Sequence, residues 1–375
     1  MSKHNTITKL LFTGLAATLL TACGGGGSSA SYTNNENTLN TASGETIQLG
    51  VDNPVCKQGT ANQEGKVIDS ATNKGIENVT VTVAGCSVQT DSNGYYTLNN
   101  IVTSNRTSVT FDKKGYLKNS SIINIDNSTS NYLEFKLETS KWKWSYNTKV
   151  GNNGGTVNIP DDAIYTIDDN SYSGDVTAYY TWENTNTPKG RDLFPGTFEG
   201  LETSGVVVPF TSYAFFNLVI KDTQGNNINT SGDIIVKVQN IENLQDEIIP
   251  LWYYNYDRGI WIEKGSAKRD PNGDYICEIP HVGTWSLNKP VETEMGLYKG
   301  NIVDENDQPI TNVRIEARGK NWISKDVTTD ENGEFEVLVV PNQKFTLSAY
   351  DYKEKYGAQF PEQLSAISAG DVVEE

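Results

Sequence analysis

The feature that most constrains this chain is a nine-residue stretch that occurs twice. Residues 90–98 and residues 329–337 both contain T-D-x-N-G, followed by residues that alternate between polar and apolar. Tight turns use Asp, Asn and Gly, and alternation is typical of a strand with one buried face. Each stretch has the same preamble, G-K-V-I-D at residues 65–69 and G-N-I-V-D at residues 300–304. The sequence therefore predicts two copies of one small β domain on either side of a different central region.

The composition agrees with an all-β protein. Val, Ile, Thr, Tyr and Asn are abundant, and the chain shows no long helical periodicity. Its 375 residues give room for about two or three domains of ordinary size. The formal net charge is −17, which opposes non-specific binding to nucleic acid and to anionic lipid. We therefore expect no nucleic-acid partner.

Residues 1–22 have the pattern of a secretory signal. Lys3 and Lys9 give a positive start, and residues 10–20 form an apolar run too short to span a bilayer stably. The run ends in L-T-A before Cys23, which resembles the bacterial lipobox, where the cysteine is acylated and becomes the mature N-terminus. Each buried methylene contributes about 0.8 kcal/mol, so two or three acyl chains would hold the protein on a lipid bilayer.

A polar tether is predicted over residues 23–54, because Gly and Ser are followed there by a run rich in Asn, Thr and Ser. Removal of the leader leaves 28 Lys and Arg against 47 Asp and Glu, a charge of 28 − 47 = −19. Gly24, rather than Asp, follows Cys23. By resemblance to lipoprotein sorting rules, this implies the bacterial outer membrane, with the face undetermined.

The first copy, residues 55–138, contains G-K-V-I-D, I-E-N-V-T-V-T-V, T-D-x-N-G-Y-Y-T-L and F-D-K-K-G-Y in order. This order resembles the carboxypeptidase regulatory-like domain over most of residues 62–138. The resemblance implies a transthyretin-like, prealbumin-type β-sandwich of about seven strands. The second copy, residues 296–375, predicts the same sandwich in shorter form. We expect a last strand near residues 358–360 and a loose end at residues 371–375.

The central region, residues 139–290, predicts a β-sandwich-like module. Residues 191–196 are expected to form a loop. Towards its end come I-P-L-W-Y, G-x-W and H-V-G-T-W, between residues 249 and 286. This order resembles a module in the extracellular part of animal membrane and matrix proteins such as cartilage intermediate layer protein. The resemblance implies a β-rich domain with no catalytic role.

Aromatic residues concentrate in that ending, and two interpretations stay open. They form a platform on which a sugar ring stacks, or they form the core. Alternation places Trp252, Tyr254 and Tyr256 on one face of a strand, but a second sheet over that face would bury them. The candidate platform comprises Trp252, Tyr254, Tyr256, Trp261 and Trp285.

The repeated turns also raise the question of calcium. Asp91 and Asn93, like Asp330 and Asn332, place oxygens at alternate positions before a glycine. Calcium needs about six to eight oxygens, however, and no glutamate stands at the distance that a calcium loop requires. The favoured interpretation is a turn stabilised by Asp, with no metal and no cofactor.

The four cysteines suggest one disulfide. Cys56 and Cys86 both fall in the first copy, and in an oxidising compartment they would close a loop of about thirty residues, contributing ~3–4 kcal/mol. The alternative is that both are buried free thiols. Cys277 is expected to be a small core residue.

Catalytic residues are hard to find. His4 lies in the leader, so only His281 remains, and no G-x-S-x-G is present. A hydrolase is therefore the least favoured function. We expect a non-catalytic binding or scaffolding lipoprotein. Carbohydrate is the first ligand class, because the carboxypeptidase regulatory-like domain shares its fold with starch-binding modules. The alternative is a structural adhesion or envelope-assembly protein that binds another protein.

Overall fold

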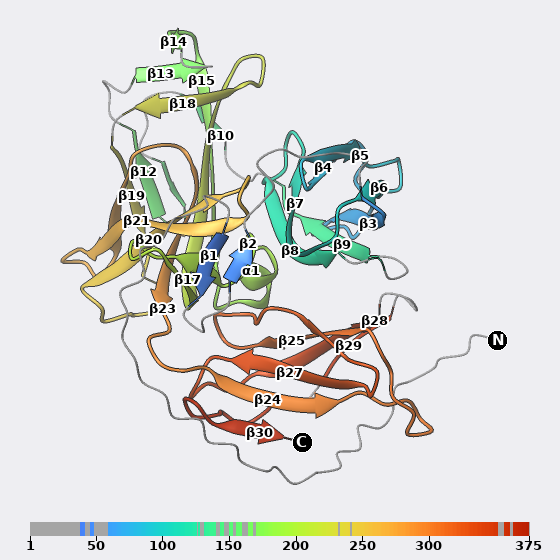
Figure 1. Cartoon of the computed structure of the whole chain (residues 1–375). Coiled ribbons are helices and arrows are strands. Elements are labelled where there is room, and N and C mark those ends of the chain that lie inside the picture. Colours follow the sequence, from blue (N-terminus) through green and yellow to red (C-terminus); the bar gives the residue numbers. More distant parts are fainter. Residues whose placement is uncertain are drawn as a thin grey trace. The chain divides into compact units, whose positions relative to one another are not determined.

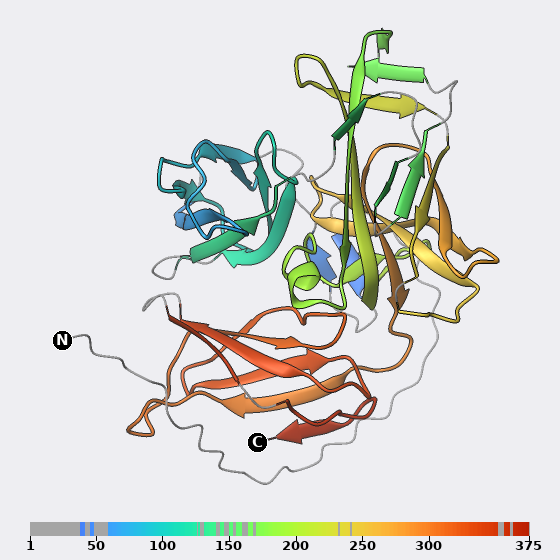
Figure 2. The ribbon, with the colours of Figure 1, turned by 180° about the vertical axis from the view of Figure 1, so that it is seen from behind.

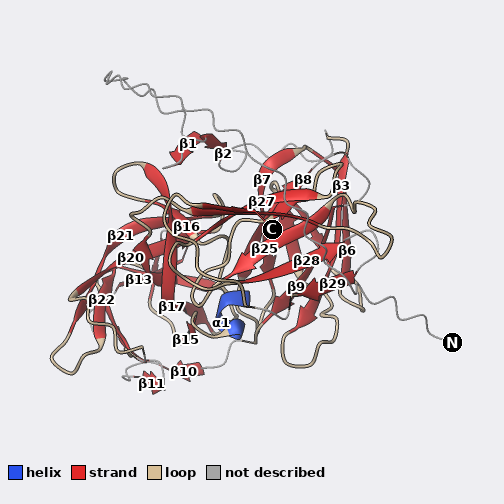
Figure 3. Ribbon diagram, turned by 90° about the horizontal axis from the view of Figure 1, so that it is seen from below, coloured by secondary structure: helices blue, strands red, loops and turns tan. Residues whose placement is uncertain are grey.

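The computed structural model describes residues 38–41, 46–48, 59–125, 127, 131–139, 143–145, 150–152, 155–159, 164–167, 170–231, 233–240, 242–351, 356–360 and 363–374. These residues form strands and one short helix, so the predicted all-β class is confirmed (Figure 3). They fall into two compact units. One contains Asn40–Val291 with Lys320–Trp322, and the other contains Glu292–Gly319 and Ile323–Glu375. Each unit is described by itself.

The first copy is a sandwich of two sheets (Figure 1). A three-stranded sheet has the order β6-β3-β9, and a four-stranded sheet has the order β5-β4-β7-β8. Strand β9 runs parallel to β3, and the other neighbours are antiparallel. The strands are β3 (Ala61–Asp69), β4 (Thr80–Val83), β5 (Cys86–Gln89), β6 (Tyr95–Ile101), β7 (Ser104–Asp112), β8 (Asn119–Ile125) and β9 (Asn131–Leu137).

The core of the first copy lies between these sheets. Val67, Val81 and Phe111 are completely buried, and the ring of Phe111 stacks on that of Phe135 with centroids 4.3 Å apart. Burying one such side chain contributes about 1.5–3 kcal/mol. Strand β6 alternates between exposed and buried residues, as its sequence predicts.

The second copy repeats this topology strand for strand. Its sheets have the orders β27-β24-β30 and β26-β25-β28-β29, and β30 runs parallel to β24 as β9 does to β3. The strands are β24 (Gly296–Asn301), β25 (Val313–Arg318), β26 (Val327–Thr328), β27 (Glu334–Val339), β28 (Thr346–Asp351), β29 (Tyr356–Gln359) and β30 (Val372–Glu374).

Strand β30 corrects one prediction. Residues 371–375 were expected to be loose, but Val372 pairs with Leu297 and Glu374 with Lys299. Three residues are too few to show a period in the sequence. The strand exists because β24 offers it a free edge, and that edge comes from a distant part of the chain.

The central module is one large sheet built along β17 (Val206–Asp222), a strand of 17 residues that pairs with β15, β16, β18 and β23 (Figures 1 and 2). In the described residues the sheet has 16 strands. The others are β1 (Thr38–Thr41), β2 (Thr46–Gln48), β10 (Lys143–Ser145), β11 (Val150–Asn152), β12 (Gly155–Asn158), β13 (Ile164–Ile167), β14 (Asn170–Tyr172), β15 (Val176–Asn184), β16 (Glu199–Leu201), β18 (Asn227–Ser231), β19 (Ile234–Val238), β20 (Ile248–Asn255), β21 (Ile260–Arg269), β22 (Tyr275–Ile279) and β23 (Gly283–Pro290).

Two predictions about irregular segments are wrong in part. Strands β1 and β2 lie within the predicted tether, and β1 pairs with β17 through Asn40 and Thr41. The expected loop at residues 191–196 begins inside helix α1 (Pro188–Asp192). Thr187 caps this helix by accepting a hydrogen bond from Gly190 N at 3.0 Å, and proline suits its first turn. Within the described ranges, no helix has the length and hydropathy needed to cross a membrane.

Candidate functional site

The repeated turn uses its aspartate to hold the backbone. In the first copy, Asp91 Oδ1 accepts hydrogen bonds from Asn93 N at 2.8 Å and Tyr95 N at 2.9 Å. Gly94 has a φ of 84°, in the left-handed region, and a Cβ there would lie 2.3 Å from Val67 O. The aspartate therefore acts as the stabiliser of a hairpin, and only glycine fits at Gly94.

The second copy repeats the same hydrogen bonds. Asp330 Oδ1 accepts from Asn332 N at 2.8 Å and from Glu334 N at 2.9 Å. The same oxygen that a metal would use is thus occupied by backbone groups, which supports the turn interpretation of these residues. Among the described residues, no group of three or more His, Cys, Asp and Glu side chains gathers where an ion could bind.

The threonine before each turn ties the strands together. Thr90 Oγ1 donates to Ile76 O at 2.6 Å and accepts from Val79 N at 2.9 Å, and its side chain is buried. In the second copy, Thr329 Oγ1 makes the equivalent bonds, to Ile310 O at 2.8 Å and from Val313 N at 3.0 Å. The T-D-x-N-G stretch is therefore a structural motif in both copies.

The aromatic stretch of the central module is core, not a platform. Trp252, Tyr254, Trp261 and Trp285 are each 0% exposed. The platform interpretation is wrong for these four, because stacking on a sugar requires a ring face in solvent. The rings are covered by neighbouring aromatics: Phe194 stacks on Trp261 with centroids 4.8 Å apart. Tyr256 is half-buried, and its hydroxyl is used within the protein as described next.

The indole nitrogens confirm that these rings belong to the core. Trp252 Nε1 donates to Asn288 O at 3.1 Å, and Trp261 Nε1 donates to Pro195 O at 2.9 Å. A buried indole needs such an acceptor, because an unpaired donor costs about 1–3 kcal/mol. Backbone carbonyls of this chain supply it, so these nitrogens are not held ready for a ligand.

Two tyrosines of this stretch join the central module to the first copy, which lies in the same compact unit. Tyr254 Oη lies 2.6 Å from Ser120 Oγ, and Tyr256 Oη donates to Lys118 O at 2.8 Å. Lys118 Nζ also lies 4.8 Å from the centre of the Tyr256 ring. We call the contacts between residues 59–138 and the central module the joint. Burial raises the pKa of Tyr254 to about 12, so its hydroxyl stays protonated at neutral pH.

Arg106 is the charged centre of the joint. It is 6% exposed, and its Nη2 donates to Gly259 O at 2.7 Å. Nη1 donates to Arg258 O at 3.4 Å, and Nε lies 3.6 Å from the carboxylate of Glu199. A buried guanidinium is costly unless it is paired and hydrogen-bonded, and here the central module supplies both. Removal of the central module would therefore leave Arg106 without these partners.

The loop after α1 completes the joint. Asn119 Nδ2 donates to Leu193 O at 2.8 Å, and Gly196 N donates to Ser120 O at 3.0 Å. Gly196 has a φ of 69°, and a Cβ there would lie 2.5 Å from the hydroxyl of Tyr254. Only glycine brings the loop backbone this close to Ser120 and Tyr254.

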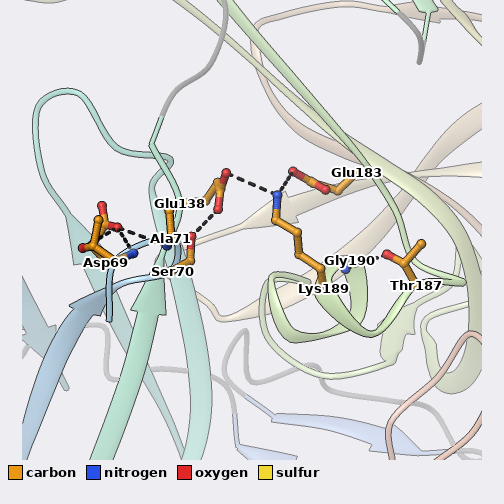
Figure 4. Close-up of polar contacts among 9 residues, drawn as sticks. Asp69, Ser70, Ala71, Glu138, Glu183, Thr187, Lys189 and Gly190 are labelled. Carbon is orange, nitrogen blue, oxygen red and sulfur yellow. Dashed lines mark hydrogen bonds and ion pairs between the residues drawn. The ribbon is translucent and has the colours of Figure 1, made fainter. Parts of the chain in front are cut away.

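A second polar contact crosses the joint at α1 (Figure 4). Lys189 Nζ lies 3.2 Å from Glu138 of the first copy and 3.3 Å from Glu183 of β15. Ser70 Oγ donates to the other oxygen of Glu138. Lys189 is 48% exposed, so each ion pair contributes at most about 1 kcal/mol. The contact therefore sets orientation more than stability.

The remaining residues singled out in the sequence are the cysteines and His281. Cys86 is disulfide-bonded, but its predicted partner Cys56 lies outside the described residues, as does Cys23. Cys277 is a buried free thiol whose pKa burial raises to about 12, so it is unreactive at neutral pH. His281 Nδ1 lies 2.8 Å from Val282 O, and its ring packs against Tyr253 and Trp285.

Sequence reasoning missed the joint. The sequence predicts a strand over residues 108–112, whereas β7 begins at Ser104 and includes Arg106. In the sequence Arg106 alternates with the polar residues Ser108 and Thr110, so no local pattern marks it as buried. Its partners Gly259 and Glu199 are far away in the sequence.

Comparison with known proteins supports one part of the chain. Residues 64–138 match the family model of the carboxypeptidase regulatory-like domain, which confirms the resemblance for the first copy. No curated protein matches the chain in sequence.

Similar solved structures are distant. The Bacillus anthracis TIE protein is 13% identical with a TM-score of 0.21, over 84% of this chain and 50% of that one. BcpA, the major pilin subunit of Bacillus cereus, is 10% identical with a TM-score of 0.18, over 84% of this chain and 97% of that one. A candidate carbohydrate-binding protein of Bacteroides uniformis is 9% identical with a TM-score of 0.19, over 59% of this chain and 100% of that one. This chain thus spans half the length of the TIE protein, and such low scores carry no argument about function.

Proposed function

We propose that this protein is a lipid-anchored, non-catalytic binding protein of the bacterial outer membrane. The lipobox-like sequence before Cys23 supports the anchor, and the carboxypeptidase regulatory-like first copy supports a binding role. The central module holds the first copy in a fixed orientation, so that a ligand is presented at a defined position relative to the rest of the unit.

The observation that carries this proposal is the joint. A buried arginine, two tyrosine hydroxyls and an asparagine amide all cross it. Domains of one chain that move freely share small, wet interfaces. Here the buried guanidinium of Arg106 donates hydrogen bonds to the carbonyls of Arg258 and Gly259. These hydrogen bonds are all lost when the two surfaces separate, so opening the joint is costly.

The joint can be tested by calorimetry on Arg106→Ala and Tyr254→Phe. We expect the wild-type first copy and central module to unfold in one transition, and Arg106→Ala to separate them. Arg106→Ala should lower the free energy of unfolding more than Tyr254→Phe does. Hydrogen bonds of a charged group contribute about 1.5–3 kcal/mol, whereas the hydrogen bond of a neutral hydroxyl contributes about 0.5–1.5 kcal/mol.

Tyr253→Phe is the matched control, because Tyr253 neighbours Tyr254 but packs against His281 and Trp285 outside the joint. It should leave the single transition intact. Separate transitions in the wild-type protein, or an equal effect of Tyr253→Phe, would contradict a fixed joint.

The anchor has its own test. Cys23→Ser removes the acylated thiol, so we expect the protein to move from the membrane pellet to the soluble fraction after cell fractionation. Mass spectrometry of the N-terminal peptide is the companion measurement, since it should show acyl chains on the wild-type protein only. Unchanged membrane association in the variant would exclude an acylated Cys23 as the anchor.

One observation favours the alternative, a structural protein that binds another protein. On the outer face of the β27-β24-β30 sheet, Leu297 pairs with Leu338 on one side and Val372 on the other. Leu338 is 49% exposed and Val372 57% exposed. A row of three apolar side chains across three strands suits a protein partner.

A further inference from the structure

The outer face of the β6-β3-β9 sheet carries an exposed aromatic side chain. Tyr95 is 46% exposed, and it is the one exposed aromatic among the residues whose side-chain exposure the structure describes. Lys66 Nζ lies 5.0 Å from the centre of its ring. Tyr96 and Leu98 point into the core, so Tyr95 and Thr97 point outward by alternation.

The sheet register adds a second tyrosine to this face. Lys66 pairs with Tyr95 on one side and Glu134 on the other. Glu64 pairs with Thr97 and with Tyr132, whose neighbour Leu133 is buried. Tyr132 therefore lies on the same face as Tyr95, two strands away and offset by two residues, or about 12 Å from strand and residue spacings.

The second copy shows that the fold does not require these tyrosines. Its register puts Glu334 at the position of Tyr95, Glu336 at that of Thr97 and Glu374 at that of Tyr132. The sandwich is otherwise the same strand for strand. The strand framework that the two copies share thus does not require tyrosine at either position.

The two faces also differ in charge. Around the tyrosines lie two carboxylates and two ammonium groups, from Glu64, Glu134, Lys66 and Lys136, which sum to zero. The face of the second copy carries three glutamates against Lys299, which already pairs with Glu336. A balanced face with donors, acceptors and aromatic rings complements an uncharged polyhydroxyl ligand. An acidic face does not.

We propose that the outer face of the β6-β3-β9 sheet binds a short neutral oligosaccharide, with Tyr95 stacking on the apolar face of one pyranose ring. Lys66, Glu64 and Thr97 hydrogen-bond its hydroxyls, and Tyr132 contacts a further ring. This inference rests on the proposed binding function and names its ligand class. It also moves the ligand face from the buried aromatic stretch of the central module to the first copy.

The test is titration calorimetry on the full mature chain, with soluble hexasaccharides of glucose, mannose and N-acetylglucosamine as probes. We expect one of these to bind the wild-type protein, with little dependence on salt because the ligand is neutral. Tyr95→Ala should weaken that binding by about tenfold or more. Tyr95→Phe should retain it, because the ring and not the hydroxyl makes the contact.

Glu334→Ala is the matched control, at the same position of the second copy, and should leave the affinity unchanged. The unfolding temperature of every variant shows that the fold is intact. Absence of binding to all three probes, or equal binding by Tyr95→Ala, would overturn this assignment. Either result would leave the fixed joint and the anchor standing, since unfolding and fractionation test those separately.

Discussion

The two copies of the sandwich share a framework and differ in what is attached to it. Thr90 and Asp91 make the same backbone hydrogen bonds as Thr329 and Asp330, and β9 pairs with β3 as β30 does with β24. The first copy alone contains cysteines and supplies Arg106 to the joint. The comparison teaches that the repeated turn encodes the fold, whereas specialisation lies in residues that the repeat does not conserve.

The largest expected difference between the copies comes from the disulfide. Cys86 is disulfide-bonded, whereas residues 296–375 contain no cysteine. Cys86→Ser should destabilise the first copy by about 2–5 kcal/mol and leave the second copy unchanged. Calorimetry with and without reductant measures this, with Cys277→Ala as the control for a buried free thiol. An equal loss in both copies would contradict the asymmetry.

A smaller and symmetrical effect is expected at the threonines of the turns. Thr90→Val and Thr329→Val keep the side-chain volume but remove a hydroxyl that makes two buried backbone hydrogen bonds. Each should lower the free energy of unfolding of its own copy by about 1–3 kcal/mol. Urea denaturation followed by fluorescence measures the loss. A large cost in one copy and none in the other would break the claim of a shared framework.

A pH dependence is expected at the aspartate that ends the preamble. Hydrogen bonds from Gln308 N and Asn306 N lower the pKa of Asp304. In Asp69, burial raises the pKa, but hydrogen bonds from Thr72 and other groups outweigh it and the pKa is lowered as well. Because both folded-state pKa values lie below the unfolded value, the stabilisation is present above the unfolded pKa and is lost as pH falls through the folded pKa.

The unfolding temperature of the second copy should therefore fall less steeply in Asp304→Asn than in the wild-type protein as the pH is lowered from about 5 to about 2. Asp69→Asn should have the same effect on the first copy. Differential scanning calorimetry across this range measures both. If the unfolding temperature of Asp304→Asn falls as steeply with decreasing pH as that of the wild-type protein, other carboxylates determine the acid sensitivity of the second copy.

The smallest expected effect is on the outer face of the second copy. Leu338→Lys changes an exposed side chain, so the free energy of unfolding should change by no more than about 0.5 kcal/mol. Self-association, measured by sedimentation, should decrease if the apolar row contacts other molecules. A loss of several kcal/mol would instead show that Leu338 is part of the core.

Local signals predicted most of the strands. The alternation in Tyr96 and Leu98 and the glycine of each turn are encoded over a few residues, so the hairpins could be placed from sequence. Strand β5 has only four residues and β30 only three, too few for an alternation to stand out, and β30 also depends on a partner that is distant in the sequence. The candidate site was harder still, since Tyr95 and Tyr132 become neighbours on one face only through the register of three strands.

The buried aromatics of the central module also show what a local sequence pattern does not predict. Alternation correctly placed Trp252 and Tyr254 on one face of a strand, but it could not show what covers that face. The covering residues come from β17, where Phe210 packs on Trp252, and from the loop after α1, where Gly196 lies against Tyr254. Exposure is a property of the whole fold, and the sequence of one strand does not contain it.

The parallel pairing of β3 with β9, and of β24 with β30, has a mechanical consequence. The first and last strands of each copy are neighbours that run in the same direction, so the two ends of the copy leave at opposite ends of the sheet. A pulling force between those ends loads the hydrogen bonds between the strands in shear, all at once. Antiparallel neighbours pulled from one end would instead open one bond at a time. Each copy is therefore built to resist traction along its length.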